Sequence, residues 1–279
     1  TAISGLARGC RALDINYATA TTATSTSPGN VAGQVSSIQA VMWNGTTMAA
    51  TTVATYSYDA TKRLVAATDS RAGLTTRYTW QTSSTRLESI TPAGLAPYRF
   101  AYATPSGSQP RLQQVTRDPA TAGGTSVILA SFVYDIDATR QTAGLPDVTQ
   151  TVTDRWFQAS TPSTGYAVFG PERPTSSISP GAVASQDWQY ADLSYVDGDG
   201  YTVDSAEYGA GQWLVTATDY DQDGRVVREL APEATSLVPA DGSMGIEQVN
   251  SLSTQTDYDA LGRVTDTWEP VREAAAGWN

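Results

Sequence analysis

The sequence contains no histidine, one cysteine and one lysine. Without histidine there is no Ser-His or Cys-His nucleophile and no imidazole general base or metal ligand. The single cysteine, Cys10, excludes an internal disulfide and a thiolate metal cluster. We expect Cys10 to be a small buried side chain.

Charge and long apolar runs are also scarce. Only 16% of the residues are charged, the net charge is -11, and the basic residues form no cluster. Nucleic acids and anionic membrane surfaces are therefore disfavoured as partners. No apolar run approaches the roughly 18 residues of a membrane helix, so we expect no membrane span. Nucleophile-elbow, phosphate-loop and dinucleotide motifs are missing as well, and we expect no cofactor, no metal and no catalytic residue.

Short alternating stretches dominate what is present. Leu13, Ile15 and Tyr17 alternate with polar residues, as do Tyr56 and Tyr58, and Asn44-Gly45 is a strong hairpin signal. Serine, threonine, alanine and glycine fill most other positions, which suits sheets with one hydroxyl-lined face. The sequence therefore predicts an all-β fold of antiparallel hairpins in a long curved or spiralling sheet.

One heptapeptide recurs and organises the chain. Residues 258–264 read Tyr-Asp-Ala-Leu-Gly-Arg-Val, residues 220–226 read Tyr-Asp-Gln-Asp-Gly-Arg-Val, and residues 58–64 read Tyr-Asp-Ala-Thr-Lys-Arg-Leu. The repeated positions, which we interpret as structural, are Tyr58, Asp59, Arg63, Tyr220, Asp221, Gly224, Arg225, Tyr258, Asp259, Gly262 and Arg263. Each copy predicts a strand, a tight turn and a return strand.

The residue types explain such a turn. The aspartate accepts backbone N–H groups two or three residues later, and glycine supplies a positive φ. We expect the arginine to begin the return strand with its head in solvent. Lys62 replaces the glycine in the first copy, which predicts a different or a strained turn there.

This pattern, with a second turn after several residues (Asp69 to Gly73, or Thr91-Pro92-Ala93-Gly94), resembles the YD repeat of the Rhs and teneurin families. The opening residues 9–17 are similar to segments of actinobacterial YD-repeat proteins. The resemblance implies a β-sheet ribbon that spirals into a hollow shell, often around a C-terminal toxin domain. It covers about a third of the chain clearly, and the remainder fits as degenerate copies.

Spacing divides the chain into four regions. Residues 1–52 are a degenerate β segment, and residues 53–139 hold YD-type repeats, in which Trp80 stands 22 residues after Tyr58. Residues 140–187 are rich in proline and predict an irregular insertion across the sheet surface. Residues 188–279 return to YD-type repeats, and Asp197-Gly198-Asp199-Gly200 predicts a turn.

Two binding alternatives stay open. Residues 219–224 match the start of a calcium loop, but the bidentate acid is missing at the twelfth position, where Leu230 stands. The many tryptophans and tyrosines also suit sugar stacking. We favour packing, with Trp43, Trp80 and Trp213 at positions equivalent to the repeat tyrosine.

The resemblance implies a non-catalytic segment of a shell that encapsulates or presents an attached toxin or effector domain. The expected partners are the remaining repeats and a C-terminal effector domain of the same polypeptide, and a cell-surface glycan or receptor is a further candidate. We expect the chain to be a fragment of a longer bacterial protein that is secreted or displayed at the cell surface. The alternative is an adhesin or carbohydrate-binding β module.

Overall fold

The computed structural model describes residues 9–105, 109–121 and 123–271 of the chain. Over these residues the fold is all-β, with one 16-stranded sheet in which the order of the strands follows the chain. Each strand pair for which a register is defined is antiparallel, as in β1 with β2 and β15 with β16. The predicted fold class is therefore confirmed.

The chain divides into two compact units, which we describe separately. The first comprises residues 1–101 and 115–127, and the second comprises residues 102–114 and 128–279. The strands up to the division are β1 (Arg11–Tyr17), β2 (Val35–Trp43), β3 (Met48–Tyr58), β4 (Leu64–Asp69), β5 (Leu74–Trp80), β6 (Leu87–Thr91), β7 (Tyr98–Ala103) and β8 (Arg111–Arg117). The later strands are β9 (Val127–Asp137), β10 (Thr164–Phe169), β11 (Ala191–Val196), β12 (Thr202–Gly209), β13 (Gln212–Tyr220), β14 (Val226–Leu230), β15 (Thr254–Tyr258) and β16 (Val264–Trp268).

One irregularity recurs at the ends of the hairpins. In β3–β4, Ser57 faces Ala66 but Tyr58 faces Leu64, so the return strand carries one extra residue. The same bulge closes β1–β2, β5–β6, β11–β12, β13–β14 and β15–β16. A bulge bends its strand and increases the local twist. It therefore places the last residue of each leading strand, usually an aromatic one, in the same local setting.

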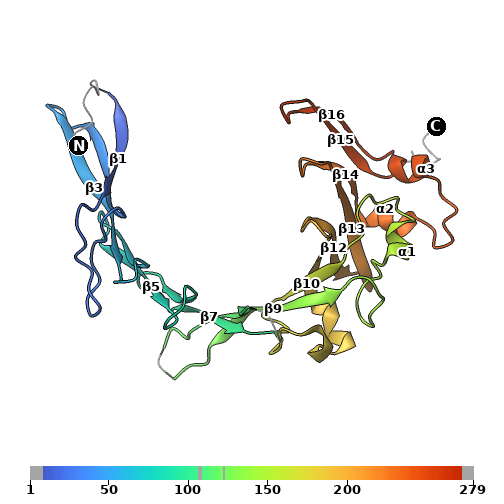
Figure 1. Ribbon diagram of the computed structural model, residues 1–279, viewed down its shortest axis with the longest axis horizontal. Helices are drawn as coiled ribbons and strands as arrows, with labels where there is room; N and C mark the ends of the chain where they lie inside the picture. The colour runs from blue at the N-terminus through green and yellow to red at the C-terminus, as the bar shows by residue number, and fades with distance from the viewer. Residues whose placement is uncertain (1–8, 106–108, 122, 272–279) are drawn as a thin grey trace. The chain divides into compact units, whose positions relative to one another are not determined.

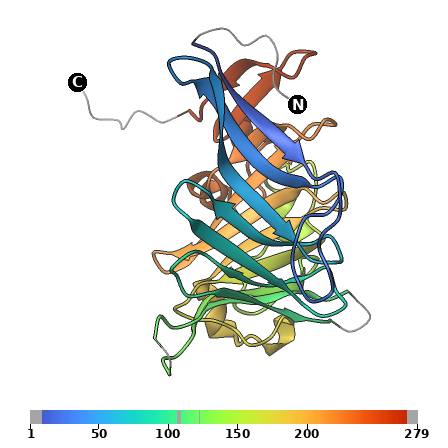
Figure 2. The same ribbon diagram turned by 90° about the vertical axis from the view of Figure 1, so that its left-hand side faces the viewer.

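The first unit is a sheet with almost no core. Among its described residues only Val31, Tyr58 and Ser89 are buried. Its long strands β1 to β3 run beside one another (Figure 2), and residues along them are half-buried or exposed on both faces. Hydrophobic burial therefore contributes little to this unit, and contacts between strands must hold it together.

The second unit has a true hydrophobic core on one face of its sheet. Alternate residues of β11 to β14 are buried there, including Leu193 and Ala217. They are covered by Trp156, by Trp188 and by Val249 of α3 (Ile246–Ser251). The short helix α2 (Pro232–Leu237) lies against β13 and β14 (Figure 1).

The proline-rich residues 140–187 differ from the expected irregular insertion. They contain α1 (Gln150–Thr153), the short 3-10 helix η1 (Pro180–Ala182), the start of η2 (Ser185–Tyr190) and a complete sheet strand, β10. β10 pairs with β9 and β11. Its buried face carries Gly165, where the ring of Tyr195 lies 2.6 Å from the place a Cβ would occupy. Small residues were needed for that close approach, so the strand lacks a strong hydrophobic alternation.

One carboxyl group lies inside this core. Asp204 on β12 is 1% exposed and faces Tyr195 across the strand pair, and neither carboxyl oxygen makes a hydrogen bond of good geometry, although the Gln158 side chain is near enough to lower its pKa slightly. Burial raises the pKa of Asp204 to about 7, and the nearby carboxylate of Asp219 adds to the shift. Between about pH 4 and pH 7 the folded state therefore keeps a proton on Asp204 that the unfolded chain, in which the pKa is 3.8, has already released.

This carboxyl group predicts a pH dependence. The free energy of unfolding should fall as the pH rises from about 4 to about 7 and level off above, because ionised Asp204 is buried without a hydrogen bond of good geometry. In urea titrations Asp204→Asn should remove most of this slope and stabilise the second unit at pH 8 by roughly 2–4 kcal/mol. The exposed Asp192→Asn serves as the control. An unchanged slope in Asp204→Asn would contradict the assignment.

Candidate functional site

The aspartate of each repeat closes its turn by the same hydrogen bonds. In the first copy Oδ1 of Asp59 accepts the backbone N–H groups of Thr61 and Arg63, at 2.8 and 3.0 Å. Asp221 and Asp259 accept the groups two and four residues later at 2.9 to 3.0 Å. The turn thus uses the second and fourth residues, where the second or third had been expected.

The arginine four residues later binds the other carboxylate oxygen. Nε donates to Oδ2 at 2.8 Å in Arg63–Asp59 and at 2.7 Å in Arg225–Asp221 and Arg263–Asp259. Nη2 lies equally close to the same oxygen in all three pairs, so two guanidinium donors meet one carboxylate oxygen in a charge-assisted contact. Backbone hydrogen bonds and the arginine lower the pKa of Asp221 and Asp259. For Asp59 burial opposes the shift, but the same hydrogen bonds still lower its pKa.

The expectation that the arginine head lies in solvent is wrong for two of the three copies. The side chains of Arg63 and Arg225 are 25% and 29% exposed, whereas that of Arg263 is 74% exposed. The difference comes from the neighbouring hairpin: the guanidinium of Arg63 lies over the ring of Trp80 at 5.7 Å, and that of Arg225 lies over Tyr258 at 5.0 Å. Each arginine therefore covers the aromatic residue of the next hairpin.

The aromatic residue completes the link from the other side. Trp80 donates Nε1–H to the carbonyl of Leu64 at 2.8 Å, and Tyr258 donates its hydroxyl to the carbonyl of Val226 at 2.9 Å. Leu64 and Val226 directly follow the arginine of the preceding hairpin. Tyr58 and Tyr220 make the same bond to Val35 and Thr202, at the start of the preceding return strand.

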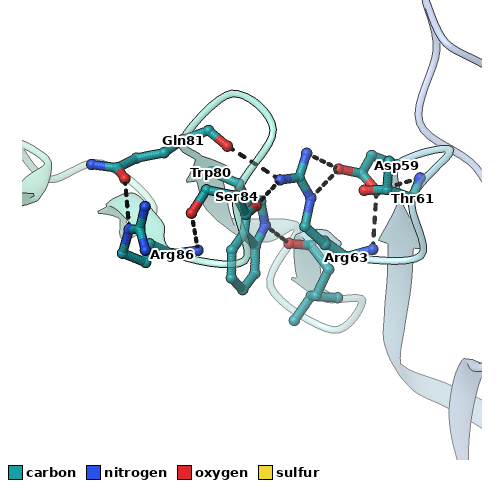
Figure 3. Close-up of polar contacts among 8 residues, drawn as sticks. Asp59, Thr61, Arg63, Trp80, Gln81, Ser84 and Arg86 are labelled. Carbon is teal, nitrogen blue, oxygen red and sulfur yellow. Dashed lines mark hydrogen bonds and ion pairs between the residues drawn. The ribbon is translucent and has the colours of Figure 1, made fainter. Parts of the chain in front are cut away.

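Figure 3 shows one complete link in the first unit. Arg63 holds Asp59 on one side and lies beside Trp80 on the other, while its Nη1 donates to the carbonyl of Ser84 at 2.6 Å. We call this arrangement the Asp–Arg–aromatic link. It joins the turn of one hairpin to the turn of the next through side chains that contact a ring and backbone carbonyls, outside the backbone ladder.

Two degenerate copies carry variants of the link. At Gln81 the amide replaces the carboxylate and accepts Nε of Arg86 at 3.1 Å. At Asp197 the carboxylate accepts the backbone N–H groups of Asp199 and Tyr201, both at 3.0 Å. Tyr201 takes the arginine position and stacks on Tyr220 of the next hairpin at 5.0 Å. The expected turn after Asp197 is confirmed, and its signal was the Asp with Gly three residues later.

Lys62 adopts the conformation of the glycine it replaces. Its φ is 70°, against 76° at Gly224 and Gly262, and its N–H donates to the carbonyl of Asp59 at 3.0 Å. The turn is therefore the same as in the other copies, and the left-handed backbone of a lysine is the strained element.

The remaining predicted positions lie elsewhere. Trp80 occupies the repeat position. Trp43 ends β2 opposite Met48 without the bulge seen at the repeat tyrosines, and Trp213 lies near the start of β13. The predicted equivalence of Trp43 and Trp213 to the repeat tyrosine is therefore wrong. Trp213 instead donates to the carbonyl of Gly144 and meets Tyr208 edge-on at 5.4 Å. The expectation that Cys10 is buried is wrong: it is exposed, because it precedes the edge strand β1 and no described element covers it.

The acidic residues 219–224 are held by arginines. Asp219 is buried and pairs with Arg228 at 2.6 Å, while Asp221 and Asp223 both contact Arg225. Arg228 also donates to the carbonyls of Trp156 and Phe157, which fixes the covering segment to the sheet. The described residues contain no group of three or more side chains suited to a metal ion. None of the described helices is long and apolar enough to cross a membrane.

The link predicts unequal costs for two similar arginines of the second unit. Arg225→Ala should lower the free energy of unfolding by about 1–3 kcal/mol, because it removes a half-buried, charge-assisted ion pair and the cover of Tyr258. Arg263→Ala removes the same pair without a ring and should cost under about 0.5 kcal/mol. Urea unfolding of both variants is the measurement. Equal losses would mean that the next hairpin adds nothing.

Lys62 provides a second prediction. Lys62→Gly should raise the stability of the first unit by about 1 kcal/mol, because glycine adopts a φ near 70° without the side-chain clash. Lys62→Ala, which keeps a Cβ, should give no such gain in the same thermal unfolding experiment. A gain in Lys62→Ala would point to charge and not to backbone conformation.

No protein-family model and no curated protein sequence matches this chain. Solved structures with a similar path of the chain include the crystal structures of TcdB2-TccC3-Cdc42 (9% identity, TM-score 0.36) and TcdB2-TccC3-TEV (10% identity, TM-score 0.37). In both, the match covers 96% of this chain but 12% of the other chain. The chain thus spans about an eighth of the length of these neighbours, and we draw its function from its own residues.

Proposed function

We propose that this chain is a non-catalytic wall segment of an Rhs or YD-repeat β shell that encloses or presents an attached toxin or effector domain. The supporting observation is the Asp–Arg–aromatic link, which recurs at Arg63–Trp80 and at Arg225–Tyr258. A link of this kind extends a sheet hairpin by hairpin without a core, which is what a thin wall requires.

The first unit has further properties of a wall. Its faces hold hydroxyl pairs that bridge neighbouring strands, Thr68 with Thr75 at 2.9 Å and Thr79 with Ser89 at 2.7 Å. Such pairs stabilise a sheet modestly and need no second layer of side chains.

The proposed partners of this segment are further repeats and an effector domain on the same polypeptide. The shell acts after secretion or at the bacterial surface. No described residue is assigned a catalytic role, since the carboxyl group with the most perturbed surroundings, Asp204, is sealed in the core.

Electron microscopy of the full-length native polypeptide that contains this segment tests the proposal. We expect a closed hollow particle with density for the effector inside. Limited proteolysis adds a second readout: the effector domain should resist cleavage in the intact particle and be cleaved once the wall is opened with denaturant. An open rod, or an effector that is cleaved at once, would overturn encapsulation.

A carbohydrate-binding module is the second candidate, and one groove favours it. The residues that line this groove include Gly170, Glu172, Arg173, Tyr190, Asp192 and Tyr208. Exposed tyrosines beside carboxylates are suited to stacking on and hydrogen bonding a sugar. The guanidinium of Arg173, however, already lies over the ring of Tyr190 at 5.9 Å. Binding on a glycan array that is lost in Tyr208→Ala and retained in Tyr166→Ala would establish this alternative.

A further inference from the structure

The last strand of the sheet, β16, carries an incomplete copy of the link. Among the described strands, β16 lies at the edge of the sheet and pairs only with β15, and all five of its residues are exposed. Val264 and Trp268 are 57% and 50% exposed. An edge strand presents unpaired N–H and C=O groups and is a template for another strand.

The unfilled half of the link is specific. Arg263 is already paired with Asp259, but among the described residues no ring lies beneath its guanidinium. The Arg263 side chain is 74% exposed. No described side chain donates to the carbonyl of Val264. The equivalent carbonyls of Leu64, Thr202 and Val226 each accept a hydrogen bond from a tryptophan or tyrosine. The position for an aromatic residue is therefore formed and empty of one in the described chain.

The charges beside this position are also unbalanced. In the preceding hairpin Asp219 faces Arg228, and the two form a buried ion pair. In the last hairpin Asp257 faces Asp266, and no described arginine or lysine contacts either carboxylate. Two like charges directly opposite each other weaken a strand pair, so a basic side chain on the next strand would relieve them.

The register of the sheet says where that basic residue belongs. Arg228 faces Gln255, which stands three residues before Tyr258 of the same strand. Asp266 stands three residues after Arg263, as Arg228 does after Arg225. A strand whose aromatic residue lies under Arg263 would therefore place its third preceding residue opposite Asp266.

We propose that the edge of β16 binds an antiparallel strand that ends in tyrosine or tryptophan and carries arginine or lysine three residues earlier. Strand β5 of this chain, Leu-Thr-Thr-Arg-Tyr-Thr-Trp, has this pattern at Arg77 and Trp80. β1 of a second copy ends in Tyr17 but has Asp14 at the third preceding position, so it would add a third carboxylate. The occupant is thus a further hairpin of the β5 type and not another copy of this chain. The inference stands whether or not the sheet encloses cargo.

A peptide with the sequence of residues 72–82 is the probe, titrated into the isotope-labelled 279-residue chain and followed by NMR. We expect chemical-shift changes confined to residues 264–268 and the turn at Arg263. The Trp80→Ala peptide should not bind. The Arg77→Glu peptide should bind roughly five-fold more weakly, and Asp266→Arg in the protein should restore its binding.

Three results would overturn the inference: no shift changes in β16 at millimolar peptide, equal changes with the Trp80→Ala peptide, or no rescue of the Arg77→Glu peptide by Asp266→Arg. Sedimentation of the chain alone tests whether a second copy of this chain binds at β16. Concentration-dependent assembly that Tyr17→Ser abolishes would identify a second copy as the partner of β16. None of these outcomes bears on the interior of the native particle, so the edge and encapsulation fail separately.

Discussion

The repeats depend on one interaction, in which the Nε and Nη2 groups of an arginine both bind Oδ2 of the aspartate four residues earlier. The aspartate alone would close a turn, since its carboxylate accepts two backbone N–H groups. The arginine also connects that turn to the next hairpin. Because Asp221 fixes the plane of the Arg225 guanidinium, the guanidinium presents its face to the ring of Tyr258. A lysine four residues later would supply a charge but no such plane.

The two units combine this interaction with different amounts of buried core. The first unit has almost no buried side chains, so its hairpins depend on backbone ladders, hydroxyl pairs and the links at Arg63. The second unit adds a core, in which Trp156 and Trp188 cover the sheet. The buried pair Asp219–Arg228 joins the covering segment to the strands, because Arg228 also binds two carbonyls of that segment. Polar contacts therefore carry the first unit and anchor the cover of the second.

The function we propose follows from this division. A sheet that grows by hairpin-to-hairpin links needs no second layer, so it can serve as a wall of one sheet's thickness. Both links have the same direction, because Arg63 and Arg225 each cover the aromatic residue of the following hairpin. At β16, Arg263 covers no ring within the described residues, and this open position is the one to which we assign a further strand.

The sequence by itself determined the elements that depend on near neighbours. Asp and Arg four residues apart, with a glycine between them, predicted the turns, and the alternation around Tyr58 and Tyr258 predicted the strands and the all-β class. It did not predict β10, whose Gly165 makes sense only beneath the ring of Tyr195. Nor did it place the arginine heads or the burial of Asp204. The arginine heads depend on residues 17 and 33 positions away, Trp80 for Arg63 and Tyr258 for Arg225, and the burial of Asp204 depends on the packed core. Turn chemistry is local and is readable from spacing, whereas the contacts between hairpins and the cover of the core exist only once the chain has folded.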